Sequence, residues 1–133
     1  MDLREDQAWL LRSRVSPLPV AGLLTLEAGR LRFTLDPEAG ESALGWLEEA
    51  LGRTGIAASL GAGEAVVAFD HPLADCVVTW PITGGGAVML IRAPDRRWVV
   101  SYEYPSTGGL GVFSGRRKAR DWKRALAESG ART

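Results

Sequence analysis

The densest group of residues that could do chemistry lies near the C-terminal end, in GRRKARDWKRAL (115–126). Six basic side chains fall within nine positions there. At about 100° per residue, as in an α-helix, Arg116, Arg120, Lys123 and Arg124 fall on one flank. A separate stripe holds small and apolar residues: Gly115, Ala119, Trp122 and Leu126. The spacing therefore predicts a helix that buries Trp122 and turns its basic residues outward.

Two readings of the basic flank stay open. Arg116, Arg120, Lys123 and Arg124 could be an ordinary solvated helix face, or they could bind an anionic partner. An acidic protein and an anionic membrane surface both fit such a flank. Nucleic acid fits less well, because a platform for single-stranded nucleic acid needs aromatic side chains between the basic ones.

Residue types that carry out catalysis are scarce. The only His, His71, and the only Cys, Cys76, are five positions apart, with nothing to mark them as a nucleophile and its base. One His and one Cys also disfavour a structural zinc site, which takes four ligands mostly of these kinds. Glu48 and Glu49 are adjacent, so on a helix they diverge and cannot act as a pair. We predict no catalytic residue, no metal site and no cofactor.

A glycine-rich stretch, GGLGVFSG (108–115), precedes the final helix. The dinucleotide-binding fingerprint needs a third glycine where this chain has Ser114, and no Gly-Lys pair completes a P-loop. We interpret the stretch as a connection to a helix that starts near Ser114, a good N-cap residue. A weaker anion site at that helix N-terminus stays open.

The tryptophans divide into two groups. Trp80, Trp98 and Trp122 occupy apolar-face positions of their segments, which predicts the core. Trp46 and Leu47 lie on an amphipathic segment, ESALGWLEEALGR (41–53), with helical spacing of its leucines. We expect Trp46 and Leu47 either to pack on the sheet or to form an exposed surface for a partner protein.

Length and composition indicate one soluble domain over residues 1–133. The net charge is zero, but residues 41–80 carry one basic and six acidic groups, whereas residues 81–133 carry ten basic and four acidic. One cysteine rules out an intramolecular disulfide and fits a reducing compartment. The N-terminal MDLREDQ does not resemble a signal peptide, and no apolar run is long enough to span a bilayer. We therefore expect a cytoplasmic protein. The sequence leaves its oligomeric state open.

Alternating apolar and polar residues predict seven strands. A hairpin turn at Ala28–Gly29 should join the second strand to the third, and Pro94–Asp95 should turn the chain between the last two. The order is three strands, a helical insertion near 41–53, four strands and a C-terminal helix to about Ser129. The expected strands span residues 8–15, 20–27, 30–36, 65–70, 74–81, 87–93 and 96–104.

Several stretches resemble bacterial pleckstrin-homology (PH) and GRAM-like proteins. GLLTLEAGRLRF (22–33) resembles their strand hairpin, and VAFDHPLADCVVTWP (67–81) is similar to a segment ending in their Trp-Pro. RRKARDWKRAL (116–126) resembles their closing helix. The resemblance implies a mainly β fold, a seven-stranded antiparallel, partly open barrel capped by the C-terminal helix. The helix near 41–53 would then be an insertion.

The resemblance implies a binding module rather than an enzyme. The family's phosphoinositide signature is a basic cluster around the first two strands, but residues 15–29 contain no Lys or Arg, and Arg12 and Arg14 alone do not make that pocket. We therefore expect a non-enzymatic module that binds an unidentified protein partner. One alternative is peripheral docking on anionic lipid through the basic helix. Another is a small ligand-binding barrel or an enzyme of unknown reaction.

Overall fold

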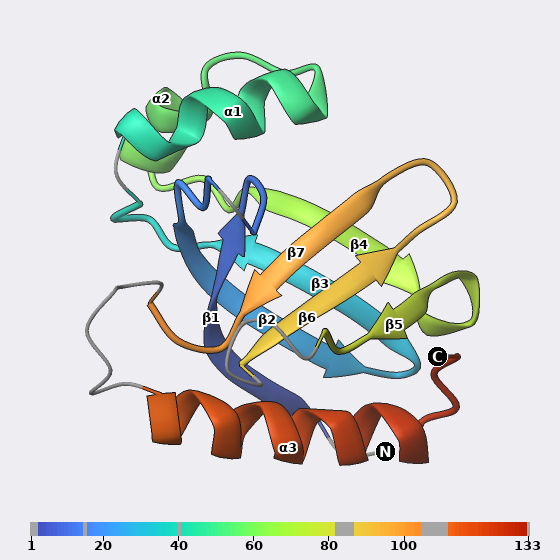
Figure 1. Ribbon diagram of the computed structural model, residues 1–133. Helices are drawn as coiled ribbons and strands as arrows, with labels where there is room; N and C mark the ends of the chain where they lie inside the picture. The colour runs from blue at the N-terminus through green and yellow to red at the C-terminus, as the bar shows by residue number, and fades with distance from the viewer. Residues whose placement is uncertain (1–2, 15, 40, 82–86, 105–111, 133) are drawn as a thin grey trace.

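The computed structural model describes residues 3–14, 16–39, 41–81, 87–104 and 112–132 (Figure 1). These residues form seven strands, three α-helices and one 3₁₀ turn. The strands are β1 (Arg4–Leu11), β2 (Val20–Glu27), β3 (Arg30–Leu35), β4 (Val67–Pro72), β5 (Val77–Thr79), β6 (Val88–Arg92) and β7 (Arg97–Ser101). The helices are α1 (Glu41–Leu51), α2 (Ile56–Gly61) and α3 (Val112–Glu128), and the 3₁₀ turn η1 (Leu73–Asp75) precedes β5.

All seven strands belong to one antiparallel sheet in the order β4-β3-β2-β1-β7-β6-β5. The two edge strands are β4 and β5, so the sheet bends round a core without closing. Figure 1 shows α1 and α2 together at one end of this barrel and α3 across the other end. The predicted fold class, an open seven-stranded antiparallel sheet with a C-terminal helix, is confirmed.

The β2–β3 hairpin forms where the sequence indicates. Ala28 and Gly29 both have positive φ, 52° and 73°. Two successive residues of this kind match the right-handed twist of the flanking strands. The hairpin holds the register in which Glu27 lies opposite Arg30 and Leu24 opposite Phe33.

The first strand begins and ends earlier than expected. It covers Arg4–Leu11 rather than residues 8–15, and its pairing with β2 runs from Arg4 opposite Leu26 to Leu10 opposite Val20. The N–H of Arg12 then donates to the carbonyl of Pro17 at 2.7 Å, which closes a loop instead of extending the ladder. The acidic N-terminal segment is therefore part of the sheet, and Arg12 and Arg14 lie in a connection.

The fifth strand is also shorter than the predicted segment at 74–81. The N–H of Cys76 donates to the carbonyl of Leu73 at 3.1 Å, which forms η1 and delays β5 to Val77. The predicted face is nevertheless correct, because Cys76 and Val78 are buried and Trp80 packs against the core.

The helical insertion between β3 and β4 is a helix pair. α1 ends at Leu51, two residues before the expected Arg53, because Gly52 takes a positive φ of 63° and Arg53 N–H bonds back to the carbonyl of Glu48. The short α2 follows, and Glu48 accepts a hydrogen bond from the N–H of Ile56 at its start. Leu44, Leu47, Ile56 and Leu60 join the core, so the pair covers one end of the barrel.

The C-terminal helix covers the other end. It begins at Val112, so Ser114 lies inside the helix and is not its N-cap, contrary to expectation. Ala119, Trp122 and Leu126 are buried as predicted, and Trp122 is fully inaccessible. Side chains thus fill the barrel from both ends, and the surfaces that could meet a partner are the outer sheet faces and the exposed helix faces.

Candidate functional site: an arginine groove on the outer sheet face

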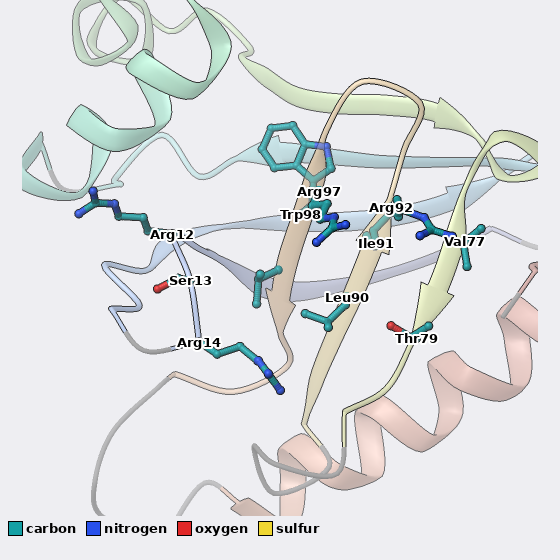
Figure 2. Close-up of a pocket in the computed structure, with 11 residues that line it drawn as sticks. Arg12, Ser13, Arg14, Val77, Thr79, Leu90, Ile91, Arg92, Arg97 and Trp98 are labelled. Carbon is teal, nitrogen blue, oxygen red and sulfur yellow. The ribbon is translucent and has the colours of Figure 1, made fainter.

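A hollow of about 540 Å³ lies on the outer face of β5, β6 and β7, beside the β1–β2 connection (Figure 2). Four arginines line it, Arg12 and Arg14 from the connection, Arg92 from β6 and Arg97 from β7. Figure 2 shows them arranged around the three strands. We call this hollow the arginine groove. Ser13 lines it from the connection, and Val77, Thr79, Leu90 and Val99 line it from the outer face of the strands.

Strand register arranges these side chains in two rows. Val99 lies opposite Leu90, and Leu90 lies opposite Thr79. Two residues further along each strand, and therefore on the same face, Arg97 lies opposite Arg92 and Arg92 opposite Val77. The groove therefore has an apolar row (Val99, Leu90) and, about 7 Å away along the strands, a basic row (Arg97, Arg92).

The basic row places two like charges next to each other. The N–H of Ala93 donates to the carbonyl of Arg96 at 2.8 Å in the β6–β7 turn. The neighbouring pair, Arg92 and Arg97, is therefore a non-hydrogen-bonded pair, in which opposed side chains lie closest. Like charges directly opposite one another are destabilising. Both arginines are exposed, and within the described residues neither forms an ion pair with a carboxylate.

The β1–β2 connection holds the other two arginines on a braced loop. Besides the Arg12–Pro17 hydrogen bond, the N–H of Ser16 donates to Oγ of Ser13 at 2.8 Å. The indole Nε1–H of Trp46, on α1, donates to the carbonyl of Leu18 at 2.8 Å. This hydrogen bond connects α1 to the loop that carries Arg12 and Arg14, and so helps to fix that side of the groove.

The structure corrects the proposed partner surface on α1. Leu47 is fully buried, so it cannot contact a partner in the folded protein. Trp46 is half-buried against the core, and its only side-chain donor, the Nε1–H, forms a hydrogen bond with the carbonyl of Leu18. The reason is that α1 turns its apolar face to the barrel end. Of the two alternatives that the sequence left open, packing against the barrel is the one observed.

The predicted basic residues of α3 are exposed and share one helix, but they differ in their surroundings. Arg116 lies near Glu103, whose pKa is raised by burial and partly lowered again by the Arg116 charge. For Arg120, Lys123 and Arg124, the described residues supply no carboxylate in ion-pair range. These three, which we call the α3 flank, are the part of the predicted set that remains open to an anionic partner.

The residues considered for catalysis have structural contacts. The His71 ring stacks on Phe69, 5.9 Å between centroids, and the Cys76 thiol donates to the carbonyl of Pro72 at 3.6 Å. Burial, with a further contribution from Asp75, raises the pKa of Cys76, which disfavours the reactive thiolate. The carboxylate of Asp70, the residue next to His71, forms an ion pair with Arg30 at 2.9 Å. No group of three or more metal-ligating side chains occurs in the described parts of the chain.

Residues 108–111, the first half of the glycine-rich stretch, lie outside the described residues, and the anion site considered there is therefore not described. Among the helices that are described, none is both long and apolar enough to cross a membrane.

Sequence reasoning missed Arg92 and Arg97, although a signal for them was present. The two residues are equidistant from the Pro94–Asp95 turn, so a tight hairpin must place them opposite each other. Arg92 and Arg97 lie on the exposed face of β6 and β7, opposite the apolar face by which the strands were predicted. What the sequence could not indicate is that the distant Arg12 and Arg14 join them.

Comparison with solved structures finds pleckstrin-homology domains. The pleckstrin homology domain of ArhGAP27 matches with a TM-score of 0.51 and 14% identity, over 97% of this chain and 98% of that chain. The Slm1 PH domain in complex with inositol-4-phosphate matches with a TM-score of 0.52 and 10% identity, over 95% and 94%. The chain therefore has a PH-like fold. No family model and no curated protein matches the sequence.

Proposed function

We propose that the chain is a non-enzymatic, PH-like binding module that takes an anionic ligand in the arginine groove. The opposed pair Arg92 and Arg97, without a carboxylate partner among the described residues, carries this proposal. The single thiol fits a reducing compartment, and on that ground we also propose a cytoplasmic location.

The physical reason is that, without a ligand, the like charges of Arg92 and Arg97 lie directly opposite each other, which is unfavourable. Two guanidinium groups on adjacent strands repel each other, and an anion placed between them adds two attractions that offset that repulsion. Guanidinium forms planar, two-pronged hydrogen bonds with carboxylate and phosphate oxygens, so arginine suits such a ligand better than lysine. Because β6 and β7 hold both residues in hydrogen-bonded strands, little backbone ordering is required on binding.

Inositol-4-phosphate is a suitable first probe, because the Slm1 PH domain, which shares the fold, is known in complex with it. We expect it to bind the wild-type protein in isothermal titration calorimetry, and unphosphorylated inositol to bind much more weakly. The double variant Arg92→Gln/Arg97→Gln should lose about tenfold or more in affinity, since it removes two charge-assisted contacts. Its free energy of unfolding should not fall, because a repulsion is also removed.

The matched control is Arg120→Gln/Arg124→Gln, which removes the same charge from α3 and should leave this affinity within about twofold. Equal weakening by the two double variants would mean that net charge, and not the groove, attracts the ligand. Undiminished binding by Arg92→Gln/Arg97→Gln would overturn the proposed site.

A second candidate function is peripheral docking on anionic lipid through the α3 flank. Its supporting observation is that Arg120, Lys123 and Arg124 are exposed on one helix without a described carboxylate partner. Each basic residue near an anionic membrane surface contributes about 1 kcal/mol of attraction. The three together would give weak, salt-sensitive association.

Vesicle sedimentation tests this candidate. Wild-type protein should sediment with phosphatidylcholine vesicles that contain phosphatidylserine and stay in solution with phosphatidylcholine alone. Arg120→Gln/Arg124→Gln should reduce the partition coefficient about tenfold or more, and Arg92→Gln/Arg97→Gln is the control with equal net charge. Equal recovery from neutral and anionic vesicles would remove the lipid function.

A further inference from the structure

The arginine groove contains an apolar pair, Leu90 and Val99, in addition to its arginines. A small anion between Arg92 and Arg97 would use only the basic row, yet Leu90 and Val99 lie beside it as half-exposed apolar side chains on the same face. The Leu90–Val99 pair stabilises the strand pairing modestly by itself, and a ligand with apolar groups would in addition remove its exposed surface from water. The two rows together therefore describe a ligand that is both acidic and apolar.

We infer that the occupant is an extended, acidic segment of a partner polypeptide in which acidic and apolar side chains alternate. This inference rests on the proposed anion site and names the class of its ligand. In an extended segment successive side chains point to opposite sides. If the segment runs across β7, β6 and β5 between the two rows, alternate side chains meet Arg97 and Arg92 on one side and Val99 and Leu90 on the other.

The outer edge of the sheet supports binding on the face rather than by strand addition. The N–H of Val78 in β5 donates to the carbonyl of Arg132 at 2.8 Å, and Val77 forms a parallel bridge with Arg132. The chain's own C-terminal segment thus occupies part of the β5 edge, where an added strand would pair. A partner segment would therefore contact the two side-chain rows of the groove rather than the backbone of an edge strand. Its specificity would come from charge and from apolar contact.

The two arginines of the β1–β2 connection extend the basic side of the groove. Arg12 is exposed and, within the described residues, has no carboxylate partner, and Arg14 also lines the hollow. Positive charge is therefore spread over the β6–β7 pair and the neighbouring loop. A segment with several acidic residues matches this spread better than one isolated charge does.

Fluorescence anisotropy with three short labelled peptides tests the inference. In the first peptide glutamate alternates with leucine, in the second glutamate alternates with serine, and in the third lysine alternates with leucine. We expect the glutamate–leucine peptide to bind about fivefold or more tightly than the glutamate–serine peptide, because only it buries the apolar row. The lysine–leucine peptide should not bind, since the arginines repel it.

The variant Leu90→Thr/Val99→Thr removes the apolar row and keeps strand-forming side chains. It should bind the two glutamate peptides equally. Val67→Thr is the matched control, because Val67 is 42% exposed on β4, outside the residues that line the groove. It should retain the wild-type preference for leucine. Thermal unfolding of each variant checks that the fold is intact.

The outcomes separate this inference from the proposed function. Equal affinity of wild type for the two glutamate peptides, or a leucine preference that survives Leu90→Thr/Val99→Thr, would overturn the polypeptide ligand. If inositol-4-phosphate still bound in that case, the anion site would stand with a small headgroup or free phosphate as its ligand. If neither a glutamate peptide nor inositol-4-phosphate bound, both proposals would fail.

Discussion

Replacing Trp122 with alanine should lower the free energy of unfolding by about 3–5 kcal/mol, the largest effect of any single change considered for this protein. The indole is fully buried between α3 and the sheet, and its ring lies 6.0 Å from that of Tyr102. Its Nε1–H donates to Oδ2 of Asp6 at 2.7 Å, and the guanidinium of Arg4 lies 5.5 Å above the ring. Truncation would leave a cavity at the barrel end and an acceptor without its donor.

Urea unfolding followed by circular dichroism measures this loss without relying on tryptophan fluorescence. Trp122→Phe is the control that keeps an aromatic ring but loses the Nε1–H donor and part of the indole volume, so it should cost about 1–3 kcal/mol. A denaturation midpoint for Trp122→Ala like that of wild type would show that α3 does not depend on this side chain for docking.

Replacing Gly22 with alanine should be the second most damaging change, with a loss of about 1–3 kcal/mol or more from overpacking. Gly22 faces the barrel interior on β2, and the ring of Phe33 on the adjacent strand lies over it. A Cβ at position 22 would come within 2.7 Å of Cζ of Phe33 and closer still to the carbonyl oxygen of Thr34. Backbone cannot move aside as a flexible side chain can, so the β2–β3 pairing would have to shift.

Gly45→Ala provides the matched control for this substitution. Gly45 lies in α1, and a Cβ there would meet no atom within 4 Å. Alanine should therefore raise the free energy of unfolding by about 0.5–1 kcal/mol, because glycine is a poor helix former. Thermal or urea unfolding of the two variants should move in opposite directions. A neutral Gly22→Ala would mean that the interior beside Phe33 is less tightly packed than described.

Trp122 and Gly22 belong to the packed interior, whereas the residues proposed to bind a ligand lie on the outer face of the sheet. Arg92, Arg97, Leu90 and Val99 belong to the same hydrogen-bonded strands whose opposite face forms the core. A variant that weakens binding through the groove should therefore leave the unfolding transition almost unchanged. This separation lets binding and stability be measured on the same set of proteins.

Periodicity made the main elements predictable. Strands β2, β3, β6 and β7 and the buried stripe of α3 follow from patterns of apolar residues spaced for a strand or a helix. The boundaries were less accurate where tertiary pairing overrode the local pattern. Residues Arg4–Gln7 look like a charged tail, yet they pair with β2, and Asp6 points to the buried indole of Trp122.

The amino-acid sequence alone predicts the order of the main strands and helices along the chain and the face that most of them turn to the core. It also determined that Arg92 and Arg97 flank one tight turn, because hairpin geometry is local. The position of the β1–β2 connection beside that hairpin, and its hydrogen bond to Trp46 on α1, follow from long-range pairing in the folded chain. The groove joins residues more than 70 positions apart, such as Arg14 and Arg92, and contacts of that range depend on how the whole sheet bends.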